Sequence, residues 1–206
     1  MIGIWDYTVI VTYISLAVSV FGITQALSGN IQGAILCLAL SGILDMFDGK
    51  IARTKKDRTE EEQVFGIQID SLCDLVCFGV FPAIICYTLG MNHKFDVGIL
   101  ILFVLFGLVR LAYFNVTEEK RQREKKGELR HEYQGLPITT IAIFLPIVYV
   151  FRGAFEQYFI IVLDVVVFVT ACLYVLDIPI KKPNGKAIAV TAIAGGVLLF
   201  KLLHIV

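Results

Sequence analysis

The chain has 206 residues, of which 57% are hydrophobic, with a mean hydropathy of +0.79 and a formal net charge of zero. This composition is too apolar for an ordinary soluble domain, so we predict an integral membrane protein. We expect no nucleic-acid partner.

Apolar stretches long enough to cross a bilayer recur along the chain. Between Tyr7 and Leu44 there is no charged residue, and a turn at Ser28-Gly29-Asn30 divides this run into two crossings. Further crossings are predicted at 65–90, 97–116, 136–151, 155–176 and 187–203. The pattern therefore predicts an all-α polytopic bundle of about six to eight transmembrane helices in a single domain, residues 1–206.

Four aspartates flank the charged stretch between the second and third predicted helices. Asp45 and Asp48 are three residues apart, and on a helix they project from one face. The same holds for Asp70 and Asp74, which are four residues apart. Two such helices facing each other would gather carboxylates that repel one another unless cations neutralise them. Magnesium and manganese prefer carboxylate oxygens and often bind phosphates too, so the pattern predicts a metal site for a phosphate ester or diphosphate.

Other interpretations of these acids stay open. The simplest is ion pairing with Lys50 and Arg53, although two cations cannot balance four acids. A cation transporter could also use intramembrane carboxylates, but such sites usually lie near the bilayer midplane between repeated halves, and the sequence shows no second copy. A structural membrane adaptor gives no reason for acids at this spacing.

Basic residues are unevenly distributed among the predicted loops. The loops after the second, fourth and sixth helices carry most of the Lys and Arg, and the intervening loops offer only Lys94 and Arg152. Because cytoplasmic loops are enriched in Lys and Arg, these basic loops and the amino terminus are predicted to be cytoplasmic. The acids would then face the cytoplasm from a multi-pass protein of the cell membrane. The charged cytoplasmic loop 117–135 either holds anionic lipid head groups or only sets the topology.

The hairpin 45–74 carries a specific order of acidic, small and basic residues. The order is Asp45-x2-Asp48-Gly49-x2-Ala52-Arg53, followed by Gly66-x3-Asp70-x3-Asp74. This order resembles the signature of the CDP-alcohol phosphotransferases, and the polytopic setting extends the resemblance to most of the chain. Residues 54–65 separate the arginine from the second glycine, a longer connection than the family's common form.

The resemblance implies a catalytic domain with the CDP-alcohol phosphotransferase fold. Within the family, the chain is most similar to the phosphatidylserine synthases, through the runs DSLCDLVCFGVFPA from Asp70, RLAYFNV from Arg110 and QGLP from Gln134. This similarity implies CDP-diacylglycerol as donor and L-serine as acceptor, phosphatidylserine and CMP as products, and a homodimer. Glycerol 3-phosphate or inositol phosphate is the alternative acceptor, because enzymes that use them share the four acids.

The family pattern also implies a role for each acid. Asp45, Asp48 and Asp70 would hold two divalent ions, Mg²⁺ or Mn²⁺, beside the diphosphate. Asp74, in the same metal cluster, would accept the proton of the serine hydroxyl.

Residues around the acids could bind the substrates. Gly49, Ala52 and Gly66 would leave room for the nucleotide against the helix backbones, or serve helix packing. Arg53 would bind a phosphate oxygen, or anchor the cytoplasmic end of its helix. Arg110, predicted at the depth of the acids, would hold the serine carboxylate or a lipid phosphate, or pair with an acid. The acceptor or lipid-phosphate pocket could be completed by Asn115, Gln134, Lys181 and Lys182.

Overall fold

A computed structural model describes residues 3–52, 54–55, 57–123, 132–177 and 179–181. The described elements, in chain order, are α1 (Tyr7–Leu27), α2 (Ile31–Ala52), α3 (Glu60–Asp74), the π-helix η1 (Leu75–Val80), α4 (Phe81–Leu89), α5 (Lys94–Arg123), β1 (Glu132–Gln134), the 3₁₀-helix η2 (Ile138–Thr140), α6 (Ile141–Val150), α7 (Arg152–Phe155), the 3₁₀-helix η3 (Glu156–Tyr158), α8 (Phe159–Val175) and β2 (Pro179–Lys181).

The described residues confirm a polytopic helical membrane protein. Five helical stretches are long and apolar enough to cross a membrane, namely Tyr7–Leu27, Ile31–Ile51, Glu60–Leu89, Lys94–Glu119 and Arg152–Val175. A shorter apolar helix covers Ile138–Val150. The crossing expected at 187–203 lies outside the described residues. The predicted all-α fold omits one small feature, because β1 and β2 pair as antiparallel strands with Gln134 opposite Pro179.

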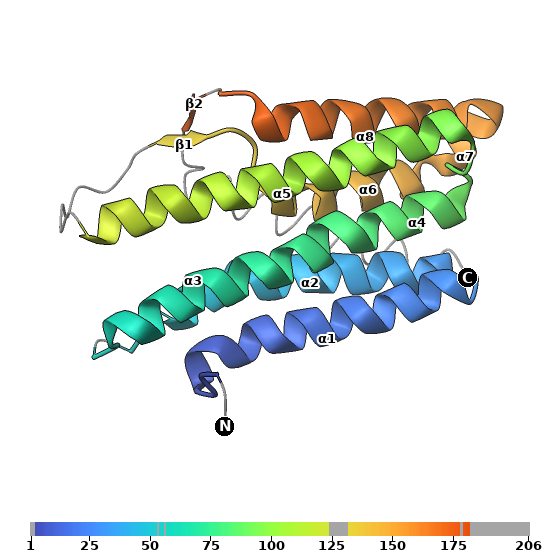
Figure 1. Cartoon of the computed structure of the whole chain (residues 1–206). Helices are drawn as coiled ribbons and strands as arrows, with labels where there is room; N and C mark the ends of the chain where they lie inside the picture. Colours follow the sequence, from blue (N-terminus) through green and yellow to red (C-terminus); the bar gives the residue numbers. More distant parts are fainter. Residues whose placement is uncertain (1–2, 53, 56, 124–131, 178, 182–206) are drawn as a thin grey trace.

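The helices lie roughly parallel or antiparallel to one another (Figure 1). α1 packs along α2, α5 packs along α8, and the rod formed by α3, η1 and α4 lies between these pairs. Figure 1 shows the starts of α1 and α3, the end of α5 and the β1–β2 pair at one end of the bundle, with α7 at the other. Elements carrying many of the predicted site residues therefore meet at a single end.

Local sequence signals explain where the first helices begin and end. Asp6 caps α1, since its side chain accepts a hydrogen bond from Thr8 N at 2.7 Å. Thr59 and Glu62 form a reciprocal capping box at the start of α3. Between α1 and α2, Gly29 adopts a φ of 85°, a backbone conformation that favours glycine. The turn expected at this position is thus present.

The α3–α4 rod contains a wider turn directly after Asp74. Residues Leu75–Val80 form a π-helix, whose hydrogen bonds span one residue more than those of an α-helix. Pro82 follows near the start of α4 and offers no backbone N–H to the preceding turns. Downstream of the wide turn, Phe81 and Ile85 are fully buried. The rod is therefore anchored in the core at its α4 end.

α1 packs closely against α2 and α4 through small and polar side chains. Ser19 and Ser41 hydroxyls lie 2.8 Å apart, and the Ser15 hydroxyl donates to the Ser41 carbonyl at 3.3 Å. A Cβ at Gly22 would lie 2.3 Å from Phe81 Cζ and 2.7 Å from Cys37 Cβ. Such close approach is typical of membrane helix interfaces, where small residues bring backbones together.

We predict that Gly22→Ala destabilises the fold, because its methyl group would overlap Cys37 Cβ and the buried ring of Phe81. Overpacking of this kind costs about 1–3 kcal/mol. Thermal unfolding in detergent should show a midpoint several degrees below that of the wild type. Gly98→Ala is the matched control, since a Cβ at Gly98 meets nothing within 4 Å. Equal midpoints for the two variants would contradict the packing described.

Candidate functional site

The acids of α2 and α3 come together between these two helices, with Asp45 about two turns before the end of α2 and Asp74 at the end of α3. Ligand oxygens of Asp45, Asp70 and Asp74 lie within 4.8 Å of one another, and all three residues are half-buried. Asp48 lies beside Asp70, and Asp45 lies within hydrogen-bonding reach of Asp74. The helical spacing in the sequence explains this meeting, because each pair occupies one face of its helix.

Asp48 is held by groups outside the acid cluster. The backbone N–H of Gly49 donates to one of its oxygens, and the hydroxyl of Thr12 lies 3.4 Å from the other. Thr12 belongs to α1 and is buried. Sequence reasoning missed this residue, although one signal was present: a stripe of polar side chains on an otherwise apolar helix, formed by Thr8, Thr12, Ser15 and Ser19.

The chemistry of this cluster fits a divalent cation. Within the described residues, none of the four aspartates forms an ion pair with Lys or Arg. Lys50, considered as a neutralising partner, is exposed and lies 5.4 Å from the centre of the Phe47 ring. Arg53 lies outside the described residues. Half-buried carboxylates within 4.8 Å of one another repel each other, and hard cations that prefer oxygen ligands would relieve that repulsion.

The predicted nucleotide residues surround the loop between α2 and α3. Gly49 is half-buried in the last turn of α2, and Ala52 ends that helix. A Cβ at Gly66 would lie 2.5 Å from Arg58 Nη2, and this guanidinium donates to the Glu62 carbonyl at 3.0 Å. Gly66 therefore leaves space for the side chain of Arg58, a contact that the sequence pattern did not indicate.

Of the residues predicted to bind the acceptor, those that the structure describes lie on helix α5 and on the β1–β2 pair. Arg110 is half-buried on α5, where its Nε donates to the Leu136 carbonyl at 3.0 Å. Gln134 and Lys181 belong to the paired strands β1 and β2, and Lys182 lies outside the described residues. Gly135 has a φ of 73°, and a Cβ there would approach the Tyr174 carbonyl to 3.1 Å. The turn after β1 thus fits tightly between α5 and the end of α8.

Asn115 connects α5 to the acid-bearing helix α3. Its side-chain oxygen accepts a hydrogen bond from Ser71 Oγ at 2.6 Å, and its amide lies 3.3 Å from Gln68 Oε1. Ser71 directly follows Asp70 in the sequence. Asn115 therefore holds α3 at the level of the acids.

Comparison with known proteins places these features in a wider group. A sequence profile described as CDP-alcohol phosphatidyltransferase matches residues 7–176. A CDP-diacylglycerol--serine O-phosphatidyltransferase of Saccharomyces cerevisiae is 39% identical over 123 residues, 59% of this chain and 43% of that protein. One of Helicobacter pylori is 33% identical over 131 residues, 63% of this chain and 51% of that protein. An archaetidylserine synthase of Methanothermobacter thermautotrophicus is 32% identical over 123 residues, 59% and 48% of the two chains. The chain spans about half the length of the curated relatives it matches.

We predict that Thr12→Val weakens Mn²⁺ binding by roughly tenfold, because groups that orient a ligand contribute to metal affinity. Valine keeps the volume of threonine but cannot donate to Asp48. Electron paramagnetic resonance of free Mn²⁺ in titrations of the purified protein measures the affinity. Thr24→Val is the control, since Thr24 lies on the same helix but its hydroxyl donates to the Phe21 carbonyl of that helix. Unchanged affinity in Thr12→Val would show that Thr12 does not support the cluster.

Proposed function

The chain belongs to the CDP-alcohol phosphatidyltransferase family, and we propose that it transfers the phosphatidyl group of CDP-diacylglycerol to the hydroxyl of L-serine, giving phosphatidylserine and CMP. The observation that carries this proposal is the meeting of Asp45, Asp70 and Asp74, signature acids from two helices, within 4.8 Å. The choice of serine draws on the relatives, two of which are named CDP-diacylglycerol--serine O-phosphatidyltransferase. The comparisons do not favour the cation-transporter alternative.

The four aspartates would divide the work between metal binding and proton transfer. Asp45, Asp48 and Asp70 would hold divalent ions, Mg²⁺ or Mn²⁺, and members of the family use such metals. When bound, these ions neutralise the diphosphate and the charge that develops as CMP leaves. Asp74 lies within hydrogen-bonding reach of Asp45, so it shares this cluster while its own oxygens can accept a proton.

The reaction is a displacement at the phosphorus that carries the diacylglycerol. Asp74 takes the proton of the serine hydroxyl, and the serine oxygen bonds to that phosphorus. The bond from this phosphorus to the oxygen bridging it to CMP then breaks, and its electron pair leaves with CMP. The chain's own contribution is to hold CDP-diacylglycerol and serine in line, which makes a bimolecular reaction effectively unimolecular.

The surrounding residues would bind the two ends of the substrates. Donor contacts are assigned to Gly49, Ala52, Arg53 and Gly66. Acceptor or lipid-phosphate contacts are assigned to Arg110, Asn115, Gln134, Lys181 and Lys182. The basic loops support a cytoplasmic position for the site, where serine arrives from water and the donor from the membrane. We also assign a homodimer to the working protein, as the family resemblance implies.

Purified protein should release CMP from CDP-diacylglycerol with Mn²⁺ or Mg²⁺ and serine. Glycerol 3-phosphate or inositol phosphate in place of serine should give little or no CMP, because the acceptor pocket must recognise the alcohol. Chromatographic detection of CMP and of the lipid product measures both outcomes. Release with one of the other acceptors alone would reassign the acceptor, and uptake of cations into liposomes without CMP release would favour a transporter.

We predict that Asp74→Asn lowers turnover by at least about a hundredfold, since an amide cannot act as a general base. Mn²⁺ binding should persist, because Asp45, Asp48 and Asp70 remain. Single-turnover CMP release at saturating Mn²⁺ separates the chemical step from metal affinity. Asp177→Asn, an exposed aspartate after α8, serves as the control and should keep wild-type turnover. Full turnover of Asp74→Asn with bound metal would refute the proposed base.

A further inference from the structure

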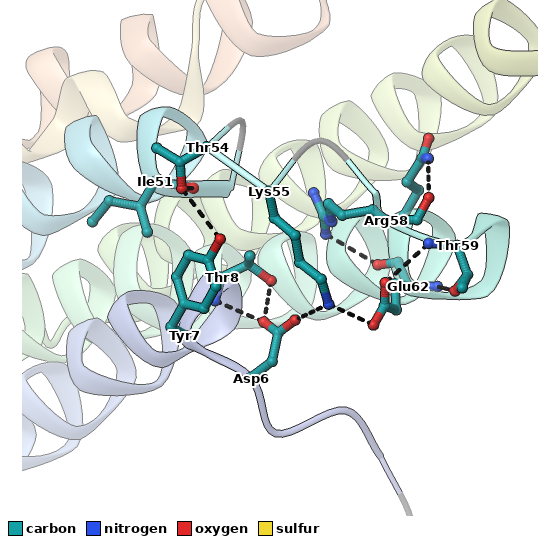
Figure 2. A network of polar contacts seen from close by, with 10 residues as sticks. Asp6, Tyr7, Thr8, Ile51, Thr54, Lys55, Arg58, Thr59 and Glu62 are labelled. Atoms are coloured by element: carbon teal, nitrogen blue, oxygen red, sulfur yellow. Dashed lines mark hydrogen bonds and ion pairs between the residues drawn. The ribbon is translucent and has the colours of Figure 1, made fainter.

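Lys55 joins three segments of the chain at the end of the bundle where α1 and α3 begin. Its ammonium is 2.7 Å from Asp6 Oδ2 and 2.7 Å from Glu62 Oε1 (Figure 2). Asp6 directly precedes α1, Lys55 lies in the loop after α2, and Glu62 lies in the first turn of α3. One side chain thus connects the starts of two helices with the loop between the two acid-bearing helices.

Both carboxylates are themselves fixed by helix caps. Asp6 accepts hydrogen bonds from the backbone N–H and the hydroxyl of Thr8. Glu62 Oε2 accepts from Thr59 N at 2.9 Å, and Thr59 Oγ1 accepts from Glu62 N at 3.1 Å. Figure 2 shows Lys55 reaching between these two capped starts. The carboxylates therefore have little freedom to follow the lysine, and the lysine and its loop are held by them.

The electrostatics of this bridge favour a persistent contact. The three side chains are only 22–24% exposed, so water screens their attraction less than at an open surface. The hydrogen bond from Lys55, followed by that from Thr8, lowers the pKa of Asp6 to about 2. Asp6 therefore stays charged throughout the physiological pH range.

The bridge and the acid cluster involve the same three helices, α1, α2 and α3. α1, which begins beside Asp6, contributes Thr12 to the Asp48 contact on α2. Through Lys55, the same end of α1 is connected to the start of α3, which carries Asp70. α1 therefore contacts the two acid-bearing helices by separate polar groups. An untethered loop between α2 and α3 would have to be ordered whenever a substrate binds, at an entropic cost.

We propose that Lys55 is a positioning residue, which fixes the α2–α3 loop and the start of α3 against α1 so that the site accepts the diphosphate donor without first ordering the loop. This inference rests on the proposed function for its kinetic consequence. The contacts of Lys55 with Asp6 and Glu62 do not rest on it, because protection of the loop amides from hydrogen exchange can be measured without turnover.

Three substitutions remove the bridge by different routes. Lys55→Met keeps the length of the side chain and removes its charge. Asp6→Asn and Glu62→Gln remove one carboxylate each, yet asparagine still caps a helix and glutamine still completes a capping box. Lys55→Arg keeps the charge and can reach both acids. Lys94→Met is the control, since Lys94 is exposed at the start of α5, away from the site.

The first measurement is hydrogen exchange of the backbone amides of residues 54–59 in detergent. Lys55→Met, Asp6→Asn and Glu62→Gln should each exchange faster in this segment than the wild type, while Lys94→Met and Lys55→Arg should match it. Unchanged protection in all three bridge variants would overturn the tether. Because two of these variants keep their helix caps, the result does not depend on whether Lys55→Met folds.

The second measurement is CMP release at varied CDP-diacylglycerol with saturating serine. Each bridge variant should raise the apparent KM for the donor by roughly threefold or more, with kcat within about twofold of the wild type. The double variant Asp6→Asn with Lys55→Met should have the same apparent KM as Lys55→Met alone. Lys55→Met already breaks the Lys55–Asp6 contact, so Asp6→Asn removes nothing further. A fall in kcat alone, or an equal KM change in Lys94→Met, would overturn the positioning role. Absence of CMP release from the wild type would instead overturn the proposed function, and hydrogen exchange would still decide on the tether.

Discussion

Mutual repulsion among carboxylates is the constraint on which the rest of this structure depends. Asp45, Asp70 and Asp74 place oxygens within 4.8 Å of one another between two helices of an apolar bundle. Such a cluster cannot be maintained by the acids themselves, since each carboxylate is disfavoured by its neighbours and by partial burial. The surrounding helices must therefore hold the acids together. α1 does so from one side through Thr12, and α5 from another through Asn115.

Periodic features of the chain could be predicted from sequence, and contacts between distant segments could not. The spacing of Asp45 with Asp48 and of Asp70 with Asp74 follows helical geometry, so their convergence needed only the assumption of a hairpin. The apolar runs similarly predicted the membrane helices. Thr12 was missed because the polar stripe of α1 does not by itself distinguish a hydroxyl that contacts another helix from one that bonds its own backbone. The β1–β2 pair was missed because three α-helices and two 3₁₀-helices separate its strands in the chain.

Small residues of the signature illustrate a second limit of sequence reasoning. Glycine at position 66 was expected to admit a nucleotide or a neighbouring helix. In the structure the guanidinium of Arg58 lies beside this glycine, 2.5 Å from where a Cβ would stand. A glycine indicates that another group lies close to the backbone, but it does not identify that group. Lys55 is a similar case. From the sequence it is one cation of a basic loop, and its contacts with Asp6 and Glu62 appear only in the structure.

The π-helix after Asp74 makes the length of this segment as important as its composition. A π-turn contains one residue more than an α-turn, so removing a single residue from Leu75–Val80 would let the rod become regular α-helix. Such a deletion would leave α3 close to its present orientation, because the wide turn absorbs one extra residue. If Leu75–Val80 instead kept all six residues and became regular α-helix, α3 would rotate by about 100° relative to α4, which Phe81 and Ile85 fix in the core. Asp70 and Asp74 would then point away from α2. The directions of Asp70 and Asp74 therefore depend on the wide turn that follows them, although no residue of that turn belongs to the acid cluster.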